Sequence, residues 1–184
     1  MPAEAIMNGN MLTQRSLWPC LVILVLLFSA AASPSRAQLI ENFSEWSAFA
    51  ATKNGKKYCY MGSKPTGEKG DYRKRGKTYI LVTHRPAEKT RDVVSISAGY
   101  SYKSESEVEV AIGGQRFRMF TDGDNAWAYD KEKENDRALT RAMRDGITMI
   151  VTGMSSRGTL TTDTYSLRGF TAAYRAIGKA CGVK

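Results

Sequence analysis

The chain has 184 residues, a formal net charge of +9 and one histidine, His84. A single histidine excludes a metal site built from two imidazoles and a relay of two histidines. The length suits one domain with its own hydrophobic core after a leader is removed.

The N-terminus predicts a signal peptide over residues 1–37 and a mature domain over residues 38–184. Arg15 precedes an apolar run at residues 17–28, and Ser35-Arg36-Ala37 has the small-x-small form of a cleavage site. The run is short for a bilayer span of about 20 residues, although a retained membrane anchor is the alternative. The mature chain is expected to have no transmembrane segment. The translation start is left open between Met1, Met7 and Met11.

Cleavage would remove Cys20 and leave two cysteines, Cys59 and Cys181. In an exported protein an isolated pair favours a disulfide, here between an early strand and the C-terminal helix. Two buried free thiols are the alternative, because cysteine also packs as a small apolar residue.

Most of the mature chain predicts short strands bounded by glycine, proline or charged turns. Gly113-Gly114-Gln115 predicts a hairpin, because two successive glycines accept positive φ. The expected strands lie around Tyr58–Tyr60 and at Tyr79–Thr83, Val93–Ala98, Val108–Ile112, Arg116–Phe120, Ala126–Tyr129, Ile147–Met154 and Thr159–Thr164.

Two helices are expected among these strands. The internal one has Asp136 as a plausible N-cap and ends at Gly146, and the second runs from Phe170 to Cys181. Helical spacing gives each an apolar stripe. The stripes are Ala138, Leu139, Ala142 and Met143, then Phe170, Ala173, Tyr174, Ile177 and Cys181. The predicted fold is mainly β, a β-sandwich or open barrel with one short internal helix and a C-terminal helix.

Positive charge is concentrated in the segment from Lys53 to Lys77. This segment has a net charge of +7, out of +8 for the mature chain. The segment is expected to form a long basic loop following the strand around Tyr58–Tyr60, and such a concentration of charge favours an anionic or protein partner. The alternative is a solvated, mobile loop. The candidate partner-binding residues are Lys53, Lys56, Lys57, Lys64, Lys69, Arg73, Lys74, Arg75 and Lys77.

A second basic group lies on the internal helix, opposite its apolar stripe. Arg137, Arg141 and Arg144 could contact a partner, but a solvated charged face is common on helices. Nucleic acid is not expected as the partner, because the chain is predicted to be exported.

Catalytic chemistry has little support. His84 could pair with a serine, but the stretch from Gly153 to Gly158 is not the G-x-S-x-G nucleophile elbow. We therefore predict no catalytic residues, no metal and no cofactor. A hydrolase using His84 remains the less favoured alternative.

Four stretches resemble the invasion-associated locus B family of alphaproteobacterial envelope proteins. One is RG-x-x-Y followed by V-T-x-RP, at Arg75–Pro86. The others are the block Ala98–Trp127, the segment Ala142–Thr159 and the closing segment Asp163–Cys181. The motifs are specific in combination, and they cover roughly three quarters of the mature chain.

The resemblance implies a mostly β protein that is periplasmic or associated with the outer membrane. Some pathogenic members are linked to invasion of host cells, and the family offers no catalytic residues to carry over. The sequence therefore favours a non-enzymatic envelope protein that binds an anionic or protein partner, active in host-cell invasion or envelope maintenance. The alternative is a scaffold subunit of an envelope complex, which would use an uncharged surface.

Overall fold

The computed structural model describes residues 37–128 and 134–183. The predicted signal peptide and the end of the strand predicted at Ala126–Tyr129 lie outside the described residues, apart from Ala37. No helix in the described part of the chain is long and apolar enough to cross a membrane.

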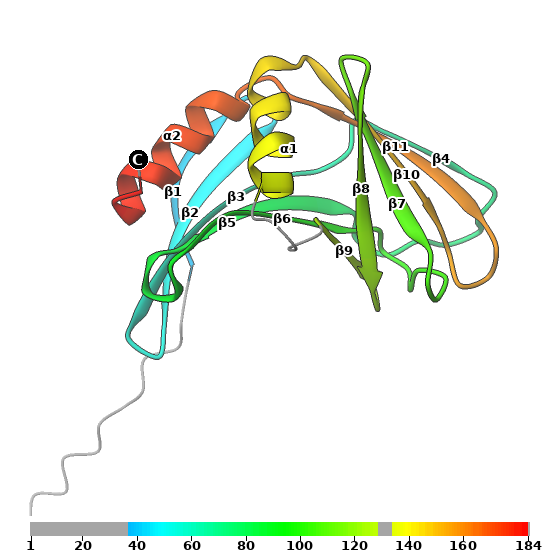
Figure 1. Cartoon of the computed structure of the whole chain (residues 1–184), viewed down its shortest axis with the longest axis horizontal. Helices are drawn as coiled ribbons and strands as arrows, with labels where there is room; N and C mark the ends of the chain where they lie inside the picture. The colour runs from blue at the N-terminus through cyan, green and yellow to red at the C-terminus, as the bar shows by residue number, and fades with distance from the viewer. Residues whose placement is uncertain (1–36, 129–133, 184) are drawn as a thin grey trace, which may run out of the picture. The chain divides into compact units, whose positions relative to one another are not determined.

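The described domain is built on one antiparallel sheet of 11 strands that does not close (Figure 1). Its order is β1-β2-β3-β5-β6-β9-β8-β7-β10-β11-β4, so β1 and β4 form the edges. The strands are β1 (Gln38–Phe43), β2 (Trp46–Lys53), β3 (Lys56–Ser63), β4 (Gly67–Gly70), β5 (Tyr79–Arg85), β6 (Thr90–Ser97), β7 (Glu107–Ile112), β8 (Gln115–Asp122), β9 (Asn125–Ala128), β10 (Thr148–Met154) and β11 (Leu160–Ser166). The mainly β prediction is confirmed, in the form of a single open sheet.

Tight turns set the register of two hairpins. Gly113 and Gly114 join β7 to β8 with φ of 53° and 83°, as the double glycine predicts. Asn54 and Gly55 join β2 to β3 in the same way, with φ of 51° and 73°. Two residues with positive φ form a turn whose twist matches that of paired strands.

The two predicted helices are present as α1 (Glu134–Asp145) and α2 (Phe170–Cys181). Helix α1 begins before Asp136, so the prediction of Asp136 as its N-cap is wrong. The carboxylate oxygen Oδ1 of Asp136 instead accepts a hydrogen bond of 3.0 Å from the backbone N–H of Val94 on β6. A side chain that a local pattern assigns to helix capping is thus used to bind the sheet.

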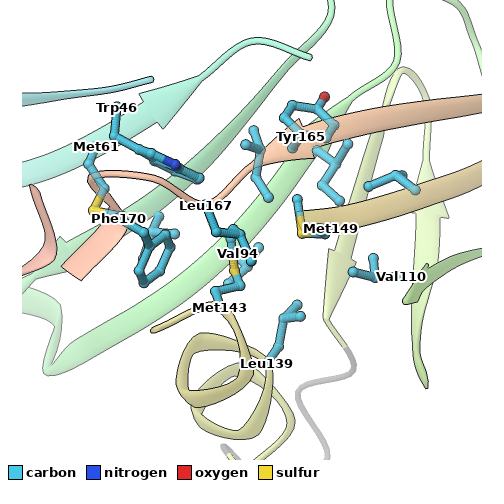
Figure 2. Close-up of a cluster of buried hydrophobic side chains, with 14 of the residues drawn as sticks. Trp46, Met61, Val94, Val110, Leu139, Met143, Met149, Tyr165, Leu167 and Phe170 are labelled. Carbon is cyan, nitrogen blue, oxygen red and sulfur yellow. The ribbon is translucent and has the colours of Figure 1, made fainter. Parts of the chain in front are cut away.

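Both helices contribute to one hydrophobic core (Figure 2). Helix α2 packs on β1, β2 and β3, while α1 packs on β6 and β8. Trp46 of β2 meets Phe170 of α2 edge to face, with ring centroids 4.9 Å apart. The indole Nε1–H of Trp46 donates to the carbonyl of Ser166 on β11 at 3.0 Å, which satisfies its polar edge inside the core.

Candidate functional site

The basic segment between Lys53 and Lys77 contains the strand expected around Tyr58–Tyr60, but the prediction of one long loop after that strand is wrong, because β4 interrupts it. Strands β3 and β4 lie within it, because Cys59 and Met61 point into the core and β4 pairs with β11. Strand β3 separates the nine basic residues into two groups. Lys53, Lys56 and Lys57 lie at the β2–β3 hairpin, and Lys64, Lys69, Arg73, Lys74, Arg75 and Lys77 follow the other end of β3.

Arg75 differs from the other basic residues because its side chain is buried, with 4% exposure. Its Nη1 and Nη2 atoms donate to the two carboxylate oxygens of Asp163 on β11, each at 2.6 Å. Its Nε donates to the carbonyl of Ala98, also at 2.6 Å. These bonds occupy the guanidinium with internal partners, so Arg75 is a structural residue rather than a free contact for a ligand.

Two tyrosine rings complete the surroundings of this guanidinium. The Arg75 Cζ atom lies 5.5 Å from the ring centroid of Tyr72 and 5.1 Å from that of Tyr100. Burial lowers the pKa of Arg75, but the bonds and the negative charge of Asp163 outweigh that effect and raise the pKa. Arg75 therefore stays charged and holds both rings by cation–π attraction.

Above this buried pair lies a groove with a volume of about 560 Å³. Three exposed cations, Arg73, Lys74 and Arg157, line it together with the rings of Tyr72 and Tyr100. Asp71 is the one exposed carboxylate among the described lining residues. The groove therefore has a positive balance and two aromatic walls.

The sequence does not single out Arg157 as a candidate, because it lies 80 positions beyond the basic segment. The available signal was the motif G-x-S-x-R-G-T, in which Arg157 stands within a tight turn. That turn is fixed by Ser155, whose hydroxyl accepts from the Thr159 backbone N–H at 3.0 Å. The connection between β10 and β11 thus brings Arg157 to the groove.

A pair of glycines allows the groove wall to form. The Gly76 backbone N–H donates to the Gly99 carbonyl at 2.8 Å. A Cβ atom on Gly99 would lie 2.6 Å from the Gly76 carbonyl oxygen, closer than real Cβ contacts. Gly99 also has a φ of +71°, which side chains disfavour. The glycines within RG-x-x-Y and AGYSY therefore permit a close approach of two backbones.

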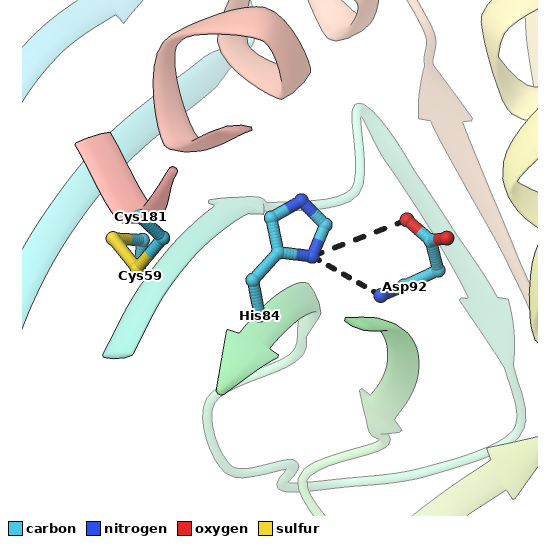
Figure 3. Close-up of a disulfide and its surroundings, with 4 residues drawn as sticks. All are labelled: Cys59, His84, Asp92 and Cys181. Atoms are coloured by element: carbon cyan, nitrogen blue, oxygen red, sulfur yellow. Dashed lines mark hydrogen bonds and ion pairs between the residues drawn. A yellow bond between two sulfur atoms is a disulfide. The ribbon is translucent and has the colours of Figure 1, made fainter. Parts of the chain in front are cut away.

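His84 lies on β5 beneath α2 and is fully buried (Figure 3). Its Nδ1 atom accepts a hydrogen bond of 3.1 Å from the Asp92 backbone N–H, and its ring meets Tyr174 edge to face. Burial lowers the pKa of His84, with Asp92 acting in the opposite direction. The structure gives His84 a place in the packing, whereas a hydrolase would need it beside a serine and within reach of substrate.

The Asp92 carboxylate in turn binds α2. The Tyr174 hydroxyl donates to Asp92 Oδ1 at 2.5 Å. Arg91 also lies 3.3 Å from this carboxylate. Through this hydrogen bond, Asp92 links α2 to the β5–β6 region of the sheet.

A disulfide joins Cys59 of β3 to Cys181 at the end of α2, as the sequence predicts (Figure 3). The two Cα atoms are 5.9 Å apart, and the residues are separated by 122 positions. Cys59 is also the register partner of His84 on β5. The disulfide and the His84 cluster therefore hold α2 at neighbouring points of the sheet.

The arginines of α1 give weaker support for a binding surface. Arg137, Arg141 and Arg144 are exposed, and the Arg144 guanidinium lies 5.5 Å from the ring centroid of Tyr174. Within residues 37–128 and 134–183, no group of three acidic, histidine or cysteine side chains could hold a metal ion. The groove is the candidate site in which exposed cations from two distant segments of the described chain converge.

These features define a class of protein: a single-sheet β domain whose C-terminal helix is joined to the sheet by a disulfide. A family model described as "Invasion associated locus B (IalB) protein" matches residues 46–178, and the chain belongs to this family. The resemblance found in the sequence is thereby confirmed. No curated protein matches the chain.

A solved structure supports the same fold. The invasion associated protein B of Bartonella henselae is 16% identical to this chain, with a TM-score of 0.50. The match covers 79% of this chain and 97% of that one. At this identity the likeness concerns the fold. Three of the four stretches that carry the family resemblance contribute residues to the groove, among them Arg75, Tyr100 and Arg157.

Proposed function

We propose that this protein is an exported, non-enzymatic component of the cell envelope that binds an anionic partner in the groove. The observation that carries the proposal is the convergence of Arg73, Lys74 and Arg157 on one groove of about 560 Å³. These three cations come from two segments that are distant in sequence. The fold brings them together above the buried Arg75–Asp163 pair.

The side chains suit phosphate or carboxylate groups. Arginine presents a planar fork of donors that binds such groups with two parallel hydrogen bonds, and lysine adds a point charge. Tyr72 and Tyr100 offer flat apolar faces, and Ser156 adds an exposed hydroxyl. An envelope component that carries acidic groups on a larger body would satisfy both parts of the lining.

The compartment is part of the proposal. A disulfide persists in an oxidising compartment, and the N-terminal sequence has the form of a cleavable signal. We place the mature protein in the periplasm, associated with the outer membrane, as the family resemblance implies. Binding there would serve envelope maintenance or, in a pathogen, invasion of host cells.

A second candidate function is a scaffold subunit of an envelope complex. The observation that favours it is edge strand β1, on which Leu39 and Ile40 are 48% and 39% exposed. An exposed apolar edge can pair with another chain. Such a contact would not depend on the groove cations.

One experiment separates the two functions. The mature protein and the variant Arg73→Gln/Lys74→Gln/Arg157→Gln are used to capture partners from solubilised envelopes at low and high salt, followed by mass spectrometry. The groove proposal predicts a partner that is lost at high salt and lost in the variant. A partner retained under both conditions would contradict it and favour the scaffold.

A further inference from the structure

The β2–β3 hairpin carries an unfavourable arrangement of charge that the groove does not explain. Lys53 and Lys56 are register partners across the two-residue turn, and Lys57 follows opposite Thr52. Directly opposed residues have Cβ atoms only about 4.5–5.5 Å apart, and like charges there are destabilising. The Lys53–Lys56 pair therefore does not stabilise the hairpin. We take this as an indication that the two lysines bind an anion outside the protein.

The surroundings of the hairpin do not neutralise these lysines. A pocket of about 430 Å³ lies between the hairpin and the β5–β6 turn, lined by Lys53, Lys56, Lys57 and Tyr58. Glu88 is the one carboxylate among the described residues that line it. Its Oε2 atom lies 3.9 Å from the Nε atom of Arg85, so another cation already shares it.

Aromatic side chains lie behind Lys53 and Lys56 on the same face of the sheet, whereas Lys57 alternates to the opposite face at the hairpin tip. Phe49 stacks on Tyr60 at a centroid distance of 5.0 Å, and Tyr60 stacks on Tyr58 at 6.0 Å. All three are half-buried. Strand alternation places Phe49 and Lys53 on one side of β2, and Lys56, Tyr58 and Tyr60 on the matching side of β3. Amphipathic rings beside basic residues are typical of side chains that sit at a membrane interface.

We propose that the β2–β3 hairpin docks on an anionic phospholipid surface, with Lys53, Lys56 and Lys57 among the headgroup phosphates. The hairpin tip lies at one end of the sheet (Figure 1), and residues 52–57 are exposed. Each lysine near an anionic leaflet strengthens binding roughly fivefold, so the three together contribute on the order of 100-fold. The hairpin and the groove use separate residues: Lys56 and Lys57 begin the eight-residue strand β3, whereas the groove cations Arg73 and Lys74 follow its other end.

The test is binding of the mature protein to vesicles of phosphatidylglycerol mixed with phosphatidylcholine, measured by co-sedimentation at low salt. The hairpin variant Lys53→Gln/Lys56→Gln/Lys57→Gln should bind on the order of 100-fold more weakly. The matched control Lys64→Gln/Lys69→Gln/Lys77→Gln makes the same change in charge at exposed sites beyond β3 and should stay within a few-fold of the wild type. Equal losses in the two variants would overturn the proposal.

Two further measurements distinguish a charged bilayer from an uncharged one and from a discrete phosphate site. Vesicles of phosphatidylcholine alone should not bind, and equal binding to them would contradict the charge argument. Release by inorganic phosphate at matched ionic strength would assign a discrete phosphate site and overturn the bilayer assignment. The groove variant should keep vesicle binding, so failure of the groove proposal can be distinguished from failure of the hairpin proposal. Thermal unfolding should show the hairpin variant to be at least as stable as the wild type, because it removes a repulsion.

Discussion

Arg75 binds Asp163 through two parallel hydrogen bonds of 2.6 Å, across 88 positions of the sequence. The pair connects the segment after β4 to β11 and supports the groove from beneath. Side-chain exposures of 4% and 3% place both charges out of water. Removing Asp163 takes the closest partner from a buried charge, since the next carboxylate oxygen, Glu68 Oε1, is 3.9 Å from Arg75 Nη1 and partly exposed. The pair is therefore a sensitive point of the fold.

The variant Asp163→Asn should therefore lose about 3–5 kcal/mol of unfolding free energy, measured by urea denaturation. The double variant Arg75→Met/Asp163→Leu should be less damaged, because it leaves no buried charge behind. Glu107→Gln is the control, since it breaks an exposed cross-strand contact to Arg118 and should cost less than about 1 kcal/mol. Similar losses in the two single variants would refute a special role for the buried pair.

Gly99→Ala should distort the groove wall and destabilise the domain. The new Cβ would meet the Gly76 carbonyl oxygen at 2.6 Å, where the obstacle is backbone that cannot rotate away. Gly123→Ala is the matched control, because Gly123 also has a positive φ, of +56°, but has nothing within 4 Å of the added atom. The difference between the two melting temperatures isolates the close approach. If Gly123→Ala is as damaging as Gly99→Ala, crowding against Gly76 is not the cause.

The Cys59–Cys181 disulfide should stabilise the domain by about 4–5 kcal/mol in the chain-entropy model, because it closes a long loop of 122 positions. The variant Cys59→Ser/Cys181→Ser should lose that amount in chemical denaturation. Its binding at the groove should be unchanged under conditions where it remains folded, since the groove lies on other elements. Two free thiols in protein purified from the periplasm, seen by mass measurement, would contradict the bridge.

Stability should fall in mild acid because of His84. Burial lowers the pKa of His84 in the folded state below its ordinary value of 6.5, so the unfolded chain takes up the proton first. The contribution of neutral His84 to the free energy of unfolding is therefore fully present above pH 6.5. It decreases as the pH falls from there toward the folded-state pKa. Urea midpoints between pH 8 and pH 5 should decline in the wild type and decline less in His84→Gln. Parallel declines in the two proteins would rule out His84 as the source.

Local sequence patterns predicted the helices and hairpins well, but they did not predict which distant side chains come into contact. The double glycine at Gly113 and the stripe ending at Cys181 depend on neighbouring residues, so the hairpin and the helix could be predicted from sequence. The groove could not, because Arg157 and Arg75 line the same groove only after β11 pairs with β4 and β10. In the sequence Arg75 cannot be distinguished from the other eight basic residues of its segment, because its partner Asp163 lies 88 positions away. Asp136 likewise has the residue type of a helix cap, but its partner lies on β6.

The groove account is tested most directly by retention on immobilised lipopolysaccharide at low salt, compared among three proteins. The wild type should be retained and Arg73→Gln/Lys74→Gln/Arg157→Gln should be released. Arg137→Gln/Arg141→Gln/Arg144→Gln, with the same loss of three positive charges on α1, should be retained like the wild type. Retention of the groove variant equal to that of the wild type would contradict the account, as would equal loss in both variants.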